Sequence, residues 1–104
     1  MFIDAIKFNI KIMQLTFIKN IQFTKLIKAD GRLREFNFRR YNSDNQQPAI
    51  FSVNVVDNRD NRIIFEMKQE DNIWKIIKQP SLPVWILENE NNFHESIEEE
   101  LKNA

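Results

Sequence analysis

The sequence contains no cysteine, which excludes a disulfide framework, a thiolate metal site and chemistry by a thiol nucleophile. A single glycine among 104 residues argues against a glycine-rich loop that holds a phosphate. His94 is the only histidine, so a site that needs two imidazole ligands is excluded as well. We therefore expect no cofactor, no bound metal and no catalytic residue.

Long hydrophobic runs are also missing. No stretch approaches the roughly 20 consecutive apolar residues of a membrane helix. The first residues lack the basic segment and apolar core of a signal peptide. We expect no membrane association and a cytoplasmic location. The length of 104 residues predicts one domain over residues 1–104.

Residues 1–20 fit two templates. Their apolar residues alternate with Lys7, Asn9 and Lys11 as in a strand, yet a second apolar set recurs at the three- and four-residue spacing of a helix. Because β-branched and bulky side chains favour strands, we expect a strand or an N-terminal extension, with Met13 as an alternative start of the chain. The strand set is Ile6, Phe8, Ile10 and Ile12, and the helix set is Ile3, Ile6, Ile10, Met13 and Phe17.

The clearest pattern lies in residues 49–68. Two runs alternate apolar and polar residues, as strands with one buried face do. The polar segment 57–61 between them is rich in Asx residues and predicts a hairpin loop. A symmetric loop brings all apolar residues of both runs to one face of the sheet. The predicted opposed pairs are Val55 with Ile63, Val53 with Phe65, and Phe51 with Met67.

A third strand follows. With residues 69–72 as a four-residue loop, Met67 is expected opposite Trp74, and Phe65 opposite Ile76. This register adds Trp74 and Ile76 to the same core face.

An earlier hairpin is indicated by Asp30-Gly31 between the runs 21–28 and 32–41. Asp-Gly is among the strongest signals for a two-residue turn, because that turn needs a positive φ at both positions. The turn places most apolar residues on one side, and leaves Leu26 and Leu33 on the other. The predicted opposed pairs are Phe23 with Phe38, Lys25 with Phe36, and Ile27 with Arg34.

The last third of the chain changes pattern. Pro80 and Pro83 end the sheet, since proline has no N–H to donate. Residues 84–87 are either an edge strand or the start of a helix. Phe93, Ile97 and Leu101 recur every four residues and predict an amphipathic helix from about residue 89 or 92 to residue 102. The sequence therefore predicts an α+β fold: an antiparallel meander of hairpins with five to six strands, and one C-terminal helix packed on a face.

Charge is distributed unevenly although the net charge is zero. Residues 1–42 carry nine Lys/Arg and three Asp/Glu, whereas residues 88–104 carry one and six. The basic part interleaves arginine with aromatic residues, a composition that suits single-stranded nucleic acid. Because Phe36 and Phe38 alternate toward the core, we favour a structural role for this strand, with Arg34 and Arg40 extending to solvent at its margins. The residues of the nucleic-acid alternative are Arg32, Arg34, Arg39, Arg40 and Tyr41.

His94 lies four residues from both Glu90 and Glu98 on the predicted helix. Such a trio can hold a divalent ion weakly, or serve a small-ligand or hydrolytic site. No neighbouring nucleophile pattern accompanies it. We favour a plain surface histidine.

We expect a non-enzymatic protein-interaction or assembly module that forms a homodimer, because a small open sheet with one helix leaves an edge or a face uncovered. Nucleic-acid binding is the alternative, and a site near His94 is a third hypothesis. The candidate interface residues are Trp85, Leu26, Leu33, Ile64 and Ile77.

Overall fold

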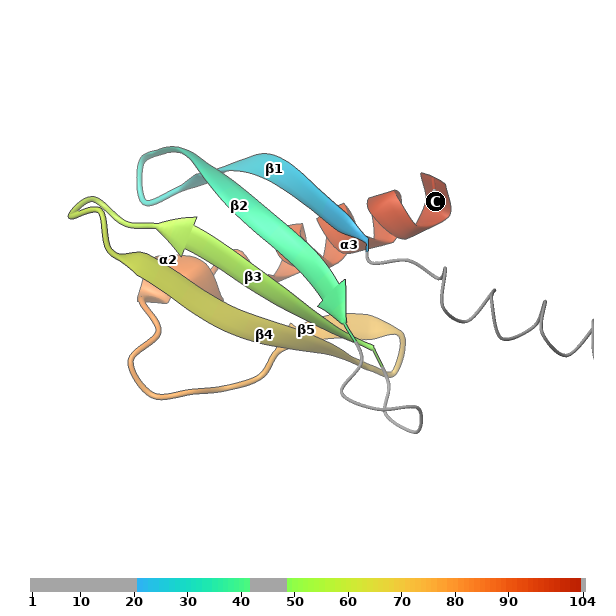
Figure 1. Ribbon diagram of the computed structural model, residues 1–104. Helices are drawn as coiled ribbons and strands as arrows, with labels where there is room; N and C mark the ends of the chain where they lie inside the picture. The colour runs from blue at the N-terminus through green and yellow to red at the C-terminus, as the bar shows by residue number, and fades with distance from the viewer. Residues whose placement is uncertain (1–20, 42–48, 104) are drawn as a thin grey trace, which may run out of the picture.

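The computed structural model describes residues 21–41 and 49–103, with the side chain of Tyr41 excepted. The predictions for residues 1–20, including the possible start at Met13, and the connector 42–48 lie outside the described residues. Five strands follow one another in space in the order of the sequence, and two helices come after them (Figure 1). The strands are β1 (Gln22–Ala29), β2 (Arg32–Tyr41), β3 (Ile50–Val56), β4 (Arg62–Glu70) and β5 (Ile73–Ile76).

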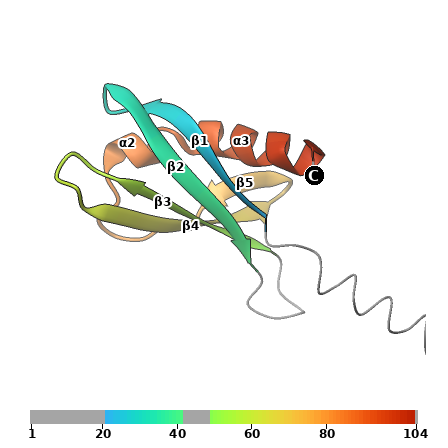
Figure 2. The ribbon, with the colours of Figure 1, turned by 45° about the horizontal axis from the view of Figure 1, so that its top comes forward.

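The predicted α+β class is confirmed. All neighbouring strands are antiparallel, so the sheet is a meander in the order β1-β2-β3-β4-β5. The helices are α2 (Val84–Leu87) and α3 (Glu90–Asn103). The strands curl, and α3 lies behind the sheet in Figure 1 and beside β1 and β5 after rotation (Figure 2). Neither described helix is long and apolar enough to cross a membrane.

Both long hairpins have the predicted register. In the first, Phe23 faces Phe38 across the turn of Asp30 (φ 55°) and Gly31 (φ 86°), so both turn residues have the positive φ that was expected. In the second, Val53 faces Phe65. The other expected pairs are also present: Lys25 with Phe36, Ile27 with Arg34, Val55 with Ile63, and Phe51 with Met67.

The loop between β3 and β4 is organised by Asp57. Its Oδ1 accepts hydrogen bonds of 2.8 Å from the backbone N–H groups of Arg59 and Asn61. A backbone hydrogen bond from Asn61 is the main cause that holds the pKa of Asp57 below its usual range. The Asx-rich segment therefore forms its turn by bonding its own backbone, as its composition predicts.

The predicted register between β4 and β5 is wrong by two residues. Met67 faces Ile76, and Gln69 faces Trp74. The connection is a two-residue turn of Asp71 (φ 53°) and Asn72 (φ 69°), not a four-residue loop. Because both side chains tolerate a positive φ, the tighter turn forms without glycine. A shift of two residues preserves the face of each side chain, so Trp74 and Ile76 still enter the core.

One hydrophobic core lies between the sheet and α3. Phe93, on α3, is at its centre: its ring centroid lies 4.9 Å from that of Phe36, 5.4 Å from that of Phe65 and 6.2 Å from that of Phe38. Of the eight strand residues predicted for this core, only Ile63 is half-buried rather than buried. The buried seven are Phe51, Val53, Val55, Phe65, Met67, Trp74 and Ile76.

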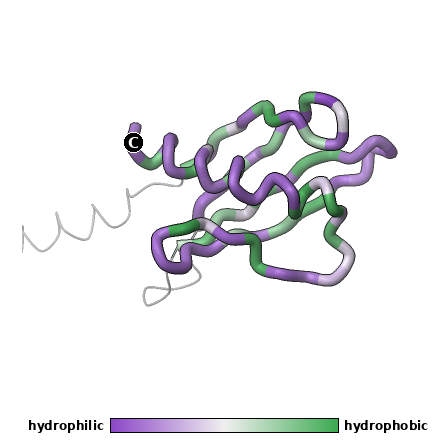
Figure 3. The backbone as a smooth tube through the Cα atoms, turned by 180° about the vertical axis from the view of Figure 1, so that it is seen from behind, coloured by the Kyte–Doolittle hydropathy of each residue, from purple (hydrophilic) through white to green (hydrophobic). Residues whose placement is uncertain are grey.

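Residues 84–87 form a helix and not an edge strand. Pro83 precedes α2 in an extended conformation (φ −62°, ψ 150°), as its ring allows at the start of a helix. Ile86 from this turn is fully buried. The longer α3 begins at Glu90 and matches the predicted amphipathic helix, with Phe93 and Ile97 fully buried. Seen from behind, most residues of α3 have the colour of hydrophilic residues (Figure 3).

Candidate functional site

The outer edge of β5 is covered by side chains of α3. The backbone N–H of Trp74 donates to His94 Nδ1 at 3.0 Å, and that of Ile76 donates to Glu90 Oε2 at 2.8 Å. The indole N–H of Trp74 also donates to Glu98 Oε2 at 3.1 Å. Residues four apart share one helix face, so the three acceptors line up along the strand. The helix therefore takes the place of a sixth strand at this edge.

The opposite edge of the sheet is β1, and alternate amides of this strand face outward. The N–H of Arg40 donates to the carbonyl of Ile21, so odd-numbered residues of β1 exchange hydrogen bonds with β2. The backbone groups of Thr24, Leu26 and Lys28 consequently point away from β2. Within residues 21–41 and 49–103, no strand pairs with them. This edge differs from that of β5, where α3 supplies acceptors.

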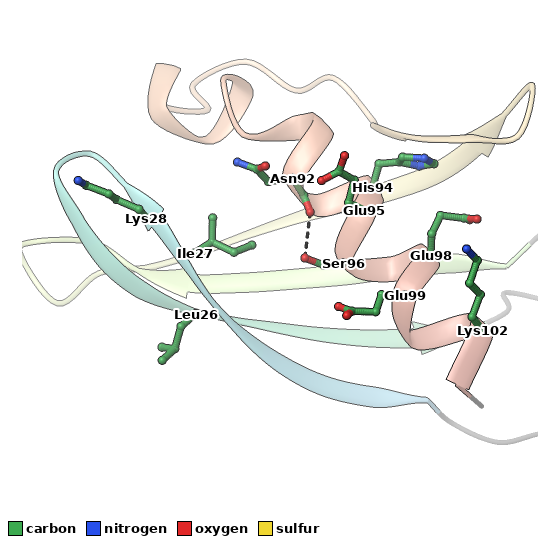
Figure 4. Close-up of a pocket in the computed structure, with 10 residues that line it drawn as sticks. All are labelled: Leu26, Ile27, Lys28, Asn92, His94, Glu95, Ser96, Glu98, Glu99 and Lys102. Atoms are coloured by element: carbon green, nitrogen blue, oxygen red, sulfur yellow. Dashed lines mark hydrogen bonds between the residues drawn. The ribbon is translucent and has the colours of Figure 1, made fainter.

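A groove of about 670 Å³ separates β1 from α3 (Figure 4). At one point Lys25 Nζ approaches Glu99 Oε1 to 2.7 Å and links the two elements. The hydrogen bond from Lys25 lowers the pKa of Glu99, which keeps this carboxylate ionised. The groove is lined by Leu26, Ile27 and Lys28 of β1, and by Asn92, His94, Glu95, Ser96, Glu98, Glu99 and Lys102 of α3.

Arg34 is buried, with 4% of its surface exposed. Its Nε donates to the carbonyl of Ala29 at 2.9 Å, and its Nη1 to that of Val56 at 3.3 Å. Its Nη2 donates to Asn58 Oδ1 at 2.8 Å, and its Cζ lies 4.7 Å from the ring centroid of half-buried Trp85. The expectation that Arg34 reaches solvent at the margin of the sheet is therefore wrong. Its guanidinium joins the β1–β2 hairpin and the β3–β4 hairpin to α2.

The other residues of the nucleic-acid alternative do not form one surface with exposed rings. Arg32 and Arg39 are exposed and Arg40 is half-exposed, whereas the side chain of Tyr41 lies outside the described residues. The rings that interleave with these arginines are both buried, with 0% exposure for Phe36 and 1% for Phe38. These two rings offer no face on which a base can stack.

The sheet face opposite α3 carries most of the candidate interface residues. Leu26 and Leu33 are each 63% exposed and Ile64 is 56% exposed, while Ile77 is half-buried. A row of polar side chains crosses this face between the leucines and Ile77. Its members are Thr24, Asn37, Asn54 and Arg62, joined by hydrogen bonds of 2.7, 3.3 and 2.6 Å.

His94 has a structural partner that the sequence did not reveal. It is half-buried and accepts from the backbone of β5, so it is not the plain surface histidine that we expected. Its two neighbouring glutamates accept hydrogen bonds from the same strand, Glu90 from the backbone N–H of Ile76 and Glu98 from the indole N–H of Trp74. In the described part of the chain, no three His, Cys, Asp or Glu residues are grouped so as to hold a metal ion. That His94 binds no metal tightly stays a prediction.

Replacement of His94 by alanine is expected to lower the free energy of unfolding by about 1 to 2 kcal/mol, because the Trp74 N–H loses its acceptor in a partly buried position. His94→Gln keeps a hydrogen-bond acceptor at this position, so it should lower the free energy of unfolding less than His94→Ala does. Hydrogen exchange gives a local measurement: in His94→Ala the exchange rate of the Trp74 amide should rise by a larger factor than that of the Val53 amide, which reports global unfolding. Equal exchange of Trp74 in both variants would contradict this role.

Comparison with known proteins finds no family model that matches the chain, no similar curated protein and no similar solved structure.

Proposed function

We propose that this protein is a non-enzymatic protein-interaction module that assembles as a homodimer. The observation that supports the proposal most directly is the exposure of Leu26 and Leu33, at 63% each, on the face that α3 leaves uncovered. Leu26 faces Glu35 and Lys28 faces Leu33, so the two leucines are diagonal neighbours across β1 and β2.

A two-fold axis over this pair would bring together four leucines, two from each copy, because a symmetric interface uses the same patch twice. Complete burial of a leucine side chain is worth about 1.5 to 3 kcal/mol relative to exposure. The polar row from Thr24 to Arg62 borders the leucines and can supply the rim of such an interface. The leucine pair therefore suits the centre of a small self-complementary contact.

Sedimentation equilibrium at high micromolar concentration is expected to give the mass of a dimer for the wild type. Leu33→Asp should shift the mass to that of a monomer, because it places a charge at the proposed centre. Leu33 is suitable for this test since its side chain is exposed and the change removes little packing of the core.

Leu87→Asp is the matched control. Leu87 is also exposed, at 46%, but lies on α2. Its replacement should leave the dimer intact. A wild-type protein that sediments as a monomer at all concentrations would refute the proposed assembly. If Leu33→Asp and Leu87→Asp weakened the dimer equally, the interface would not be centred on Leu33.

A further inference from the structure

The two edges of the sheet are treated differently by α3. On β5 the outward amides of Trp74 and Ile76 both donate to side chains of the helix. On β1 the outward backbone groups of Thr24, Leu26 and Lys28 have no partner strand among the described residues, and a groove lies between them and α3. An open strand edge is a template for another strand.

The groove lies between β1 and α3 and has a volume of about 670 Å³. Strands pair at a spacing of about 4.8 Å, so a segment added to β1 occupies the space next to this edge. α3 forms the other side of the groove, and the contact between Lys25 and Glu99 shows that it stays close to β1. A single extended segment added at this edge would have β1 on one side and α3 on the other.

The charge of α3 selects the chemistry of that segment. The helix carries five glutamates against one lysine. In Figure 4, Lys28 and Lys102 lie at the two ends of the groove, and the carboxylates of Glu95, Glu98 and Glu99 lie between them. Of these, Glu95 has no cationic partner among the described residues and is exposed. Basic side chains in the middle of an added strand would therefore meet opposite charge.

We propose that the groove between β1 and α3 binds an extended segment of a partner protein by strand addition, and that this segment alternates Lys or Arg with apolar residues. Its main chain pairs with the outward groups of Thr24, Leu26 and Lys28. Its basic side chains point to α3, and its apolar side chains meet Leu26 on the other face, because successive side chains of a strand alternate. This site shares the side chain of Leu26 with the proposed dimer, whose centre also includes Leu33 on β2, but its main-chain contacts lie on the outward edge of β1.

The probe is a synthetic seven-residue peptide, blocked at both ends, that alternates lysine with valine; its control has glutamate in place of lysine. Amide hydrogen exchange of the full chain is followed by NMR. In the free protein, the amides of Thr24, Leu26 and Lys28 should exchange quickly, and those of Trp74 and Ile76 slowly. The lysine peptide should slow the hydrogen exchange of the β1 amides about tenfold or more. This factor corresponds to the net free energy of one or two backbone hydrogen bonds. The glutamate peptide should have no effect.

Leu26→Pro tests the main-chain part of the proposal. The N–H of Leu26 points away from β2, so proline removes a donor to the added strand without removing a bond of the sheet. We expect about tenfold weaker peptide binding. Leu26→Thr is the matched control, since it shortens the side chain but keeps the N–H, and should weaken binding less. Circular dichroism verifies that both variants fold.

Glu95→Lys tests the charge without touching β1. Glu95 is exposed, so its reversal should leave the fold intact and weaken the lysine peptide about threefold to tenfold, with less loss at high salt. Leu33→Asp should bind the peptide as the wild type does, which separates this site from the dimer.

Three results would overturn the proposal. Slow exchange of the β1 amides in the free protein would show that the chain itself or a second copy already covers this edge. Peptide binding that is equal in Leu26→Pro and Leu26→Thr would exclude strand addition. Equal affinity for the lysine and glutamate peptides would exclude the selection of basic segments.

Discussion

Replacement of Phe93 by alanine is expected to lower the free energy of unfolding by about 3 to 5 kcal/mol, which is the cost of removing a buried aromatic ring from a core. Phe93 has 0% exposure and is the side chain through which α3 contacts the rings of β2 and β4. A domain of this size has about 5 to 15 kcal/mol in total, so one change removes a large part of its stability.

Urea unfolding followed by tryptophan fluorescence measures this loss. Phe93→Leu retains most of the side-chain volume and should lower the free energy of unfolding clearly less than Phe93→Ala does, because the cavity that it leaves is smaller. Leu101 lies on the same helix face but is only half-buried, so Leu101→Ala should also lower the free energy of unfolding less than Phe93→Ala does. A loss below about 1 kcal/mol in Phe93→Ala would mean that α3 does not hold the core together as the structure indicates.

Replacement of Arg34 by methionine is expected to lower the free energy of unfolding by about 2 to 4 kcal/mol, the cost of leaving several partners of a charged donor unpaired. Methionine fills much of the space of the arginine stem. It leaves the carbonyls of Ala29 and Val56 without this donor, and it removes the cation over the ring of Trp85.

Arg34→Lys distinguishes the charge from the shape of the guanidinium. Lysine keeps the charge but cannot donate to three acceptors in one plane, so we expect it to recover only part of the loss. Arg39→Met is the surface control, with a change within about 0.5 kcal/mol, because Arg39 is exposed. Arg34→Met and Arg39→Met of equal stability would refute a structural role for Arg34.

The sheet was readable from the sequence because alternation and turn composition agree. Phe51, Val53 and Val55 alternate with polar residues, and Asp30-Gly31 fixes the first turn, so face and register support each other. The β4–β5 register failed because Asp71 and Asn72 adopt positive φ without a glycine to mark the turn. The prediction still placed Trp74 on the correct face, because side chains alternate with a period of two and a shift of two residues does not change the face.

The side-chain contacts at the edges of the sheet could not be predicted from the sequence in this way. The hydrogen bonds that the β5 amides donate to His94 and Glu90 join residues 20 and 14 positions apart, and no local pattern specifies them. Arg34 gave a partial signal, because it occupies an inward position in the alternation of β2. Sequence reasoning placed it at the margin since a buried arginine needs partners, and its partners come from three other loops and strands.

The placement of α3 after all five strands has a consequence for synthesis. The meander pairs only sequential strands, so the sheet can form while the chain is still being made. Phe93 and the acceptors for the β5 amides leave the ribosome later than the strands that they cover. Until then one face of the nascent sheet exposes Phe36, Phe38 and Phe65, which Phe93 contacts in the folded chain, and both edges of the sheet are unpaired. Such a state favours aggregation and chaperone binding. Ribosome-bound chains stalled before residue 90 should therefore be the forms that chaperones retain, and release should follow the emergence of α3.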